Sequence, residues 1–264
     1  MFEFDFMKNA FWAILLITPL FGLIGTMTVN NKLAFFSDAL GHSALTGIAI
    51  GVLLGISDPI VSMSVFSIIF ALLLNEIKRS GISSNDTIIS VFSSVSVALG
   101  LVLLSQAGSF AKYSSYLVGD ILTIISSELK LMAVISVITF LFWVFFFNKL
   151  LAASTNMSLA ESRGINVKFA ETLFIILIAI IVTISIKWVG ILIINSLLIL
   201  PAASSRNLAR NMRSYHLLAI LFALISGIAG LIISYQLNTA TGPTIVLVSA
   251  VIFFTTFFMR KAKN

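Results

Sequence analysis

The chain contains no cysteine, and among its 264 residues there are only four prolines and two histidines. Without cysteine, disulfide bonds and thiolate metal ligands are excluded. Charged residues are also scarce: they make up 10% of the sequence, whereas hydrophobic residues make up 59%. Soluble globular domains carry about 25% charged residues. The composition therefore excludes a soluble domain and predicts an all-α protein that crosses a membrane several times.

Motifs for nucleotide binding and for common hydrolases are missing as well. The sequence has no G-x-x-x-x-G-K-[ST] phosphate-binding loop, no H-E-x-x-H and no glycine-rich dinucleotide pattern. We therefore expect no nucleotide site, no permanently bound cofactor and no enzymatic activity. If the chain serves ATP-driven transport, ATP is hydrolysed by a different chain.

Nine apolar segments are long enough, or nearly long enough, to cross a bilayer. They lie at residues 10–29, 33–56, 59–75, 87–107, 129–147, 169–186, 188–205, 215–235 and 244–259. Because several are near the lower length limit, we expect a transmembrane helical bundle of eight to nine spans, in contact with membrane lipid. It would form a single transmembrane domain over residues 1–264. Residues 108–128 fit a surface loop, an interfacial helix or a short re-entrant piece.

Two prolines bear on helix boundaries. Asp58 followed by Pro59 is typical of an N-cap and a first helical residue. Pro201 removes a backbone hydrogen bond late in the seventh span, so we expect it to kink or end that helix.

Basic residues indicate the orientation. The net charge of +6 lies in short loops, where it points to placement in the bilayer rather than to a nucleic-acid partner. One set of alternating loops holds 12 of the 16 basic residues, namely Lys32, Lys78, Arg79, Lys149, Arg163, Lys168, Arg206, Arg210, Arg213, Arg260, Lys261 and Lys263. The positive-inside rule places this set in the cytoplasm. The C-terminus is then cytoplasmic and, with nine spans, the N-terminus is outside.

Asp38 and His42 lie inside the second span. An ionisable residue at membrane depth is expensive and is by default a candidate functional residue. Four residues apart, the two side chains share one helix face, and a carboxylate beside an imidazole is the beginning of a site for a divalent transition metal. His42 lies roughly 15 Å along the helix from Lys32, near the middle of the membrane. The alternative is a structural hydrogen bond across a helix interface.

A row of small residues runs beside this pair. Its members are each four apart and let another helix approach closely: Ala39, Ser43, Gly47, Gly51 and Gly55. On the cytoplasmic side, residues 155–168 form the longest polar insertion between spans. This insertion is either a docking element for a cytoplasmic partner or a solvated loop.

Three motifs resemble the zinc/manganese/iron permease family of ABC transporters. The run from Ser37 to Ala49 resembles the family's D-A-L-S-H-A-x-L-P-G-I-A signature, with Gly41 in place of the serine and Thr46 in place of the proline. The segment from Ala160 to Val167 resembles its A-x-x-x-G-[IV]-[NP]-V cytoplasmic motif. The stretch from Val189 to Ala203 resembles its V-G-x-L-L-V-x-A-L-L-I-x-P-A-A motif.

The resemblance implies a membrane permease subunit of an ATP-driven importer of zinc or manganese, with iron as a third candidate. It also implies a fold similar to that of the large cobalamin- and siderophore-type importers. It implies a homodimer in the plasma membrane of a prokaryote, two copies of an ABC ATPase subunit inside and a metal-loaded solute-binding protein outside. Asp38 and His42 would then line the ion path. The residues that would couple the chain to the ATPase are Ala160, Arg163, Gly164 and Val167.

Two other functions fit the same residues. In a proton-coupled secondary carrier, Asp38 and His42 would relay protons, and the isolated chain would transport. In a non-transporting membrane scaffold, the pair would be structural. Residues 155–168 favour the ATP-driven importer. One aspartate and one histidine suit Zn²⁺, Mn²⁺ and Fe²⁺ alike, so the metal is left open.

Overall fold

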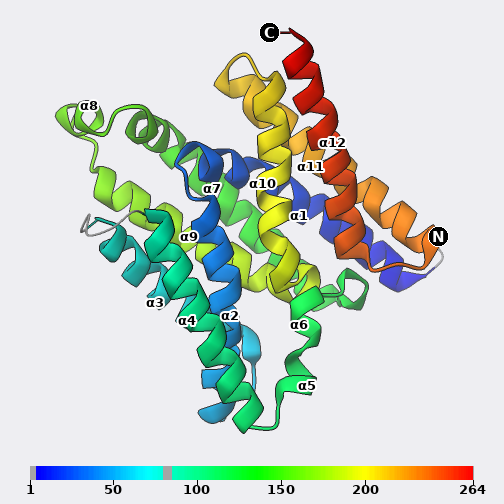
Figure 1. Cartoon of the computed structure of the whole chain (residues 1–264). Coiled ribbons are helices and arrows are strands. Elements are labelled where there is room, and N and C mark those ends of the chain that lie inside the picture. The colour runs from blue at the N-terminus through cyan, green and yellow to red at the C-terminus, as the bar shows by residue number, and fades with distance from the viewer. Residues whose placement is uncertain (1–3, 80–84, 264) are drawn as a thin grey trace. The chain divides into compact units, whose positions relative to one another are not determined.

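The computed structural model describes residues 4–79 and 85–263. Over these ranges the chain is helical, and nine of its described helices are long and apolar enough to cross a membrane (Figure 1). They are α1 (Asp5–Asn30), α2 (Ala34–Leu53), α3 (Pro59–Arg79), α4 (Asn85–Gln106), α7 (Ser126–Thr155), α9 (Val167–Val189), α10 (Ile191–Leu208), α11 (Met212–Leu237) and α12 (Thr241–Lys263). Each overlaps one of the nine segments expected from hydropathy, so the all-α architecture is confirmed.

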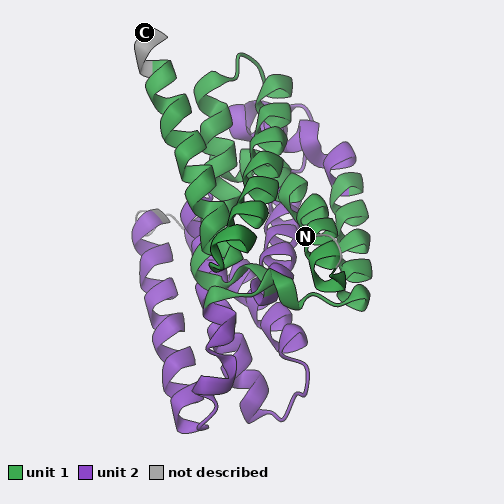
Figure 2. Cartoon of the chain, turned by 90° about the vertical axis from the view of Figure 1, so that its right-hand side faces the viewer, with its two compact units in different colours: residues 1–32, 118–141, 188–264 green, residues 33–117, 142–187 purple. Residues whose placement is uncertain are grey.

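The helices belong to two compact units (Figure 2). One unit comprises residues 1–32, 118–141 and 188–264, and the other comprises residues 33–117 and 142–187. Each unit brings together parts of the chain that are far apart in sequence.

In the second of these units, α2 packs against both α3 and α4. Glycines make the close approach possible. A Cβ atom at Gly47 would lie 2.8 Å from Met63 Cα on α3, and one at Gly51 would lie 2.5 Å from Ser62 Cβ. On the other side, a Cβ atom at Gly100 of α4 would lie 2.8 Å from the Thr46 backbone nitrogen. α2 therefore packs between α3 and α4, with its backbone close to theirs.

Gly55 does not continue the row of small residues, which corrects the expectation for this position. α2 ends at Leu53, and Gly55 follows with a φ of +70° and no atom within 4 Å of where its Cβ would lie. The N–H of Ile56 donates to Gly51 O at 2.9 Å, and the N–H of Gly55 donates to Val52 O at 3.2 Å. This pair of bonds is a Schellman motif, so Gly55 caps the helix because it adopts the left-handed conformation.

Helix α3 begins as expected. Its first residue is Pro59, and the N–H of Ile60 donates to Asp58 Oδ1 at 2.9 Å. The carboxylate of the cap accepts from a backbone N–H of the first turn that has no acceptor within the helix.

In the other unit, α1 packs against α10 and α11, and α10, α11 and α12 contact one another. Of the two outcomes expected at Pro201, a kink or an end of the helix, the end does not occur, because α10 continues through Pro201 to Leu208. Pro201 and the neighbouring Ala202 are buried. Proline is tolerated within such a helix where packing against neighbouring helices outweighs the lost hydrogen bond.

Residues 108–128 form short pieces: α5 (Phe110–Tyr113), α6 (Ser115–Val118) and the 3₁₀ turn η1 (Ile121–Thr123). None of these is long enough to cross a membrane. After α6 the chain passes close to the junction of α9 and α10. A Cβ atom at Gly119 would lie 2.9 Å from Gly190 Cα, and one at Gly190 would lie 2.7 Å from Gly119 N. Both glycines have positive φ, of +69° and +92°, so both positions favour glycine.

Candidate functional site

Asp38 and His42 lie one turn apart on α2, with His42 Nε2 at 3.6 Å from Asp38 Oδ2. Their side chains are 42% and 28% exposed, although most of α2 is buried. Phe35, one turn before Asp38, is also exposed. The pair therefore lies on a stripe of α2 that the described residues leave partly uncovered.

This arrangement supplies an incomplete metal site. In residues 4–79 and 85–263 no group of three or more histidine, aspartate or glutamate side chains lies close enough to hold a metal ion. Transition metals in proteins usually take four or more ligands. A metal ion at Asp38 and His42 would need its remaining ligands from another molecule, from water or from the backbone.

Thr46, one turn beyond His42, fixes the position of α2. Its Oγ1 donates to the backbone carbonyl of Ser96 on α4 and lies 3.1 Å from Ser96 Oγ. Both residues are buried. The bond between Thr46 and Ser96 could not be predicted from the sequence, because a cross-helix bond between residues 50 apart leaves no local pattern.

Residues 155–168 form a capped helical element. α8 (Met157–Ser162) has Asn156 as its N-cap, whose side chain accepts from the N–H of Leu159 at 3.0 Å. At the other end, Gly164 has a φ of +76°, and Ile165 N–H donates to Ala160 O at 3.1 Å. This is a second Schellman motif.

The four residues expected to couple the chain to an ATPase divide into two pairs. Ala160 and Val167 are each 1% exposed, so they anchor the element to the rest of the chain. Arg163 and Gly164 are exposed and form its surface. Only the exposed pair is in a position to meet a separate protein.

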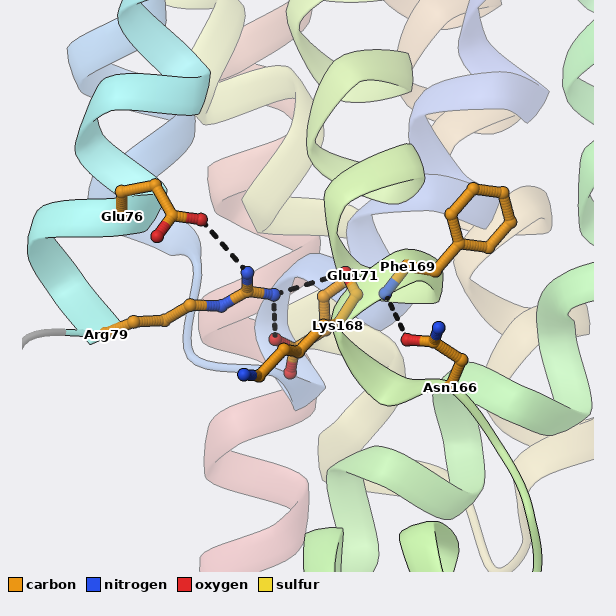
Figure 3. A network of polar contacts seen from close by, with 6 residues as sticks. All are labelled: Glu76, Arg79, Asn166, Lys168, Phe169 and Glu171. Carbon is orange, nitrogen blue, oxygen red and sulfur yellow. Dashed lines mark hydrogen bonds and ion pairs between the residues drawn. The ribbon is translucent and has the colours of Figure 1, made fainter.

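The end of α3 is tied to the start of α9 (Figure 3). Arg79 Nη2 donates to the backbone oxygen of Lys168 at 3.2 Å and lies 3.4 Å from Glu171 Oε2, while Nη1 lies 3.2 Å from Glu76 Oε1. Asn166 caps α9 by accepting from the N–H of Phe169 at 3.0 Å. The contacts of Arg79 with α9 could not be predicted from the sequence, because Lys168 and Glu171 are 89 and 92 residues away from Arg79.

The model of the ABC 3 transport family matches residues 3–260. The high-affinity zinc uptake system membrane protein ZnuB of Haemophilus influenzae is 34% identical over 239 residues, which cover 90% of this chain and 91% of that protein. The manganese import system permease protein ScaB of Streptococcus gordonii is 30% identical over 257 residues, covering 97% of this chain and 92% of that protein.

Solved structures agree with these relatives. PsaBC from Streptococcus pneumoniae, in complex with Fab, superposes with a TM-score of 0.87 at 29% identity, covering 99% of this chain and 96% of that chain. The match extends over the whole chain, as does that of the family model. The chain therefore belongs to the ABC 3 transport family of membrane permeases.

Proposed function

We propose that this chain is the membrane permease subunit of an ATP-driven importer of divalent transition metal ions, with zinc or manganese as the first candidates and iron as a third. The observation that carries the proposal is the partly exposed Asp38–His42 pair on a helix that is mostly buried. The relatives support the choice of cargo, since one is named for zinc uptake and another for manganese import.

The pair would act as half of a transient ion site. A single chain offers one carboxylate and one imidazole, and a second copy facing it across a two-fold axis would double this to four ligands. A weak site suits transport, because an ion that binds tightly does not leave. The chain would therefore work as a homodimer, with the metal as cargo and not as a resident cofactor.

The remaining partners follow from the chain's own chemistry. Since the sequence has no phosphate-binding loop, two copies of a separate ABC ATPase subunit would hydrolyse ATP. They would dock on α8 and on the exposed residues Arg163 and Gly164. A solute-binding protein would deliver the metal on the opposite side of the membrane. The excess of basic residues in the set of loops that includes residues 155–168 supports a cytoplasmic position for these loops and for the C-terminus, in a prokaryotic cell.

The test is uptake of radioactive Zn²⁺, Mn²⁺ and Fe²⁺ by vesicles that contain the chain together with its ATPase and binding protein. Asp38→Ala and His42→Ala should each abolish uptake, while Phe35→Ala, on the same exposed stripe, should leave it largely intact.

Folding is controlled by measuring the amount of each variant in the membrane. Because both side chains are partly exposed, neither substitution should lower that amount. Uptake at the wild-type rate in both variants would reduce the pair to a structural contact. Uptake by the chain alone, driven by a proton gradient, would favour a secondary carrier instead.

A further inference from the structure

Arg79 is the last residue of α3, and its guanidinium joins two helices. It contacts Glu76 on its own helix, and it contacts both the backbone oxygen of Lys168 in the first turn of α9 and the carboxylate of Glu171 one turn further along. In Figure 3 the side chain of Arg79 extends from α3 to the start of α9, whereas the ring of Phe169 points away from it. One side chain therefore holds the end of one transmembrane helix against the beginning of another.

Partial burial makes this contact stronger than an ordinary surface ion pair. The side chain of Arg79 is 23% exposed and that of Glu171 is 33% exposed, whereas that of Glu76 is 75% exposed. An ion pair on the surface contributes little to stability. A guanidinium that has lost most of its water is destabilised unless its N–H groups have acceptors in the protein. The charge of Arg79 also suits its position, since a cation in the last turn of α3 complements the helix dipole.

The tie lies between two elements that the proposed transport cycle would have to connect. Residues 155–168, which include α8, end where α9 begins, and Lys168 is the residue whose carbonyl Arg79 binds. At the other end, α3 packs against α2 at Gly47 and Gly51, within the same compact unit. α2 carries Asp38 and His42. A continuous series of contacts therefore runs from the coupling segment through Arg79 and α3 to the helix of the candidate metal site.

We propose that Arg79 is a positioning residue for transport, which makes the end of α3 and the first turn of α9 move as one body. A displacement of α8 by the ATPase would then move α3, and α3 would move α2 through the glycine contact. Without the guanidinium, α9 could shift while α3 and α2 stay in place. The inference rests on the proposed function in one respect only, which is the source of the displacement.

The first experiment measures metal ions moved per ATP hydrolysed by the complete complex in vesicles. Arg79→Gln should lower this ratio by about two- to thirtyfold, the range found for substitutions along coupling networks, while ATP hydrolysis continues. Glu171→Gln should lower it less, because the bond to the Lys168 carbonyl remains. Glu76→Gln is the matched control: it removes only the contact within α3 and should leave the ratio unchanged.

Rescue separates positioning from general stability. Arg79→Glu alone should lower the ratio of metal ions to ATP at least as much as Arg79→Gln does. Adding Glu171→Arg should restore part of this ratio, because the double variant again places opposite charges at the two positions. Arg79→Lys keeps the charge but loses the fork that binds two acceptors, so it should give an intermediate ratio. Should Arg79→Gln fail to accumulate in the membrane, Arg79→Lys and Glu171→Gln still provide the comparison.

The second experiment measures the tie directly and does not depend on transport. Because the chain has no cysteine, spin labels can be placed at Ile69→Cys on α3 and Phe169→Cys on α9, both more than half exposed. The distance between them should be narrowly distributed in the wild-type background and in Glu76→Gln, with and without nucleotide. In Arg79→Gln the distribution should broaden, even in the isolated chain.

Either of two results overturns the inference. One is an unchanged label distribution in Arg79→Gln; the other is a ratio of ions to ATP that is the same in Arg79→Gln and in Glu76→Gln. If the wild-type complex hydrolyses ATP and moves no metal, the proposed function fails, but the label distances still decide whether Arg79 joins α3 to α9.

Discussion

At the scale of single residues, position on a helix decides what each polar group of α2 can do. Thr46 is buried and bonded to α4, so its hydroxyl is occupied within the chain. Asp38 and His42 lie on the uncovered stripe, so their oxygen and nitrogen atoms can reach an ion or a second molecule. The contact of 3.6 Å between them leaves both groups able to bind elsewhere.

Gly47 gives a stability prediction at this scale. Gly47→Leu should destabilise the protein by about 1–3 kcal/mol, because its side chain would overlap the backbone of α3 near Met63. The measurement is the midpoint of thermal unfolding of the purified chain in detergent. Phe35→Leu, at an exposed position of the same helix, should leave the midpoint unchanged. A stable Gly47→Leu would mean that α2 and α3 can separate without cost.

At the scale of elements, α8 is a short helix that is capped at both ends. Gly164 closes this element in the left-handed conformation, with open space where a side chain would project. A residue other than glycine costs about 1–2 kcal/mol in this conformation, and asparagine costs least. The space means that a substitution changes the surface of α8 without pushing on the rest of the chain.

We therefore expect Gly164→Glu to uncouple the ATPase from the permease while leaving the membrane helices folded. It adds bulk and a negative charge to the surface that the ATPase would contact. Gly164→Asn is the matched control and should retain most of the activity. The measurement is stimulation of ATP hydrolysis when the two proteins are combined, at equal membrane abundance. Equal stimulation by Gly164→Glu and the wild type would show that α8 is not the docking element.

The long helices could be predicted from the sequence because hydropathy reports them directly. Each predicted span overlaps an observed helix, and the cap at Asp58 was found from two adjacent residues. Pro201 stays inside α10 because tertiary packing outweighs the local tendency of proline to end a helix. At Gly55 the reason is local, since the glycine adopts the left-handed conformation that ends α2 instead of continuing the row of small residues.

The candidate site was predicted less completely. Asp38 and His42 could be found because charges are rare in this sequence. The bond between Thr46 and Ser96 and the contacts of Arg79 with α9 join residues that are 50 to 92 apart in the sequence. A single sequence carries no signal for such pairs.

At the scale of the whole molecule, the chain should act only as part of a larger complex. The purified chain should neither bind nor hydrolyse ATP, because its sequence has no phosphate-binding loop. Co-expressed with its ATPase, it should form a complex of two permeases and two ATPases. Light scattering in detergent and an ATPase assay check both points. Hydrolysis by the chain alone, free of contaminating ATPase, would contradict the proposed division of labour.

The close passage of Gly119 past Gly190 divides residues 108–128 into two stretches that should respond differently to added length. Gly119 itself lies against Gly190, and after it η1 packs against α1 with Ile121 and Ile124 buried, so extra residues there would displace packed atoms. Before it, Gly108 has no atom within 4 Å of where a side chain would begin. An epitope tag for reporting membrane sidedness in intact cells therefore belongs at Gly108 and not beyond Gly119.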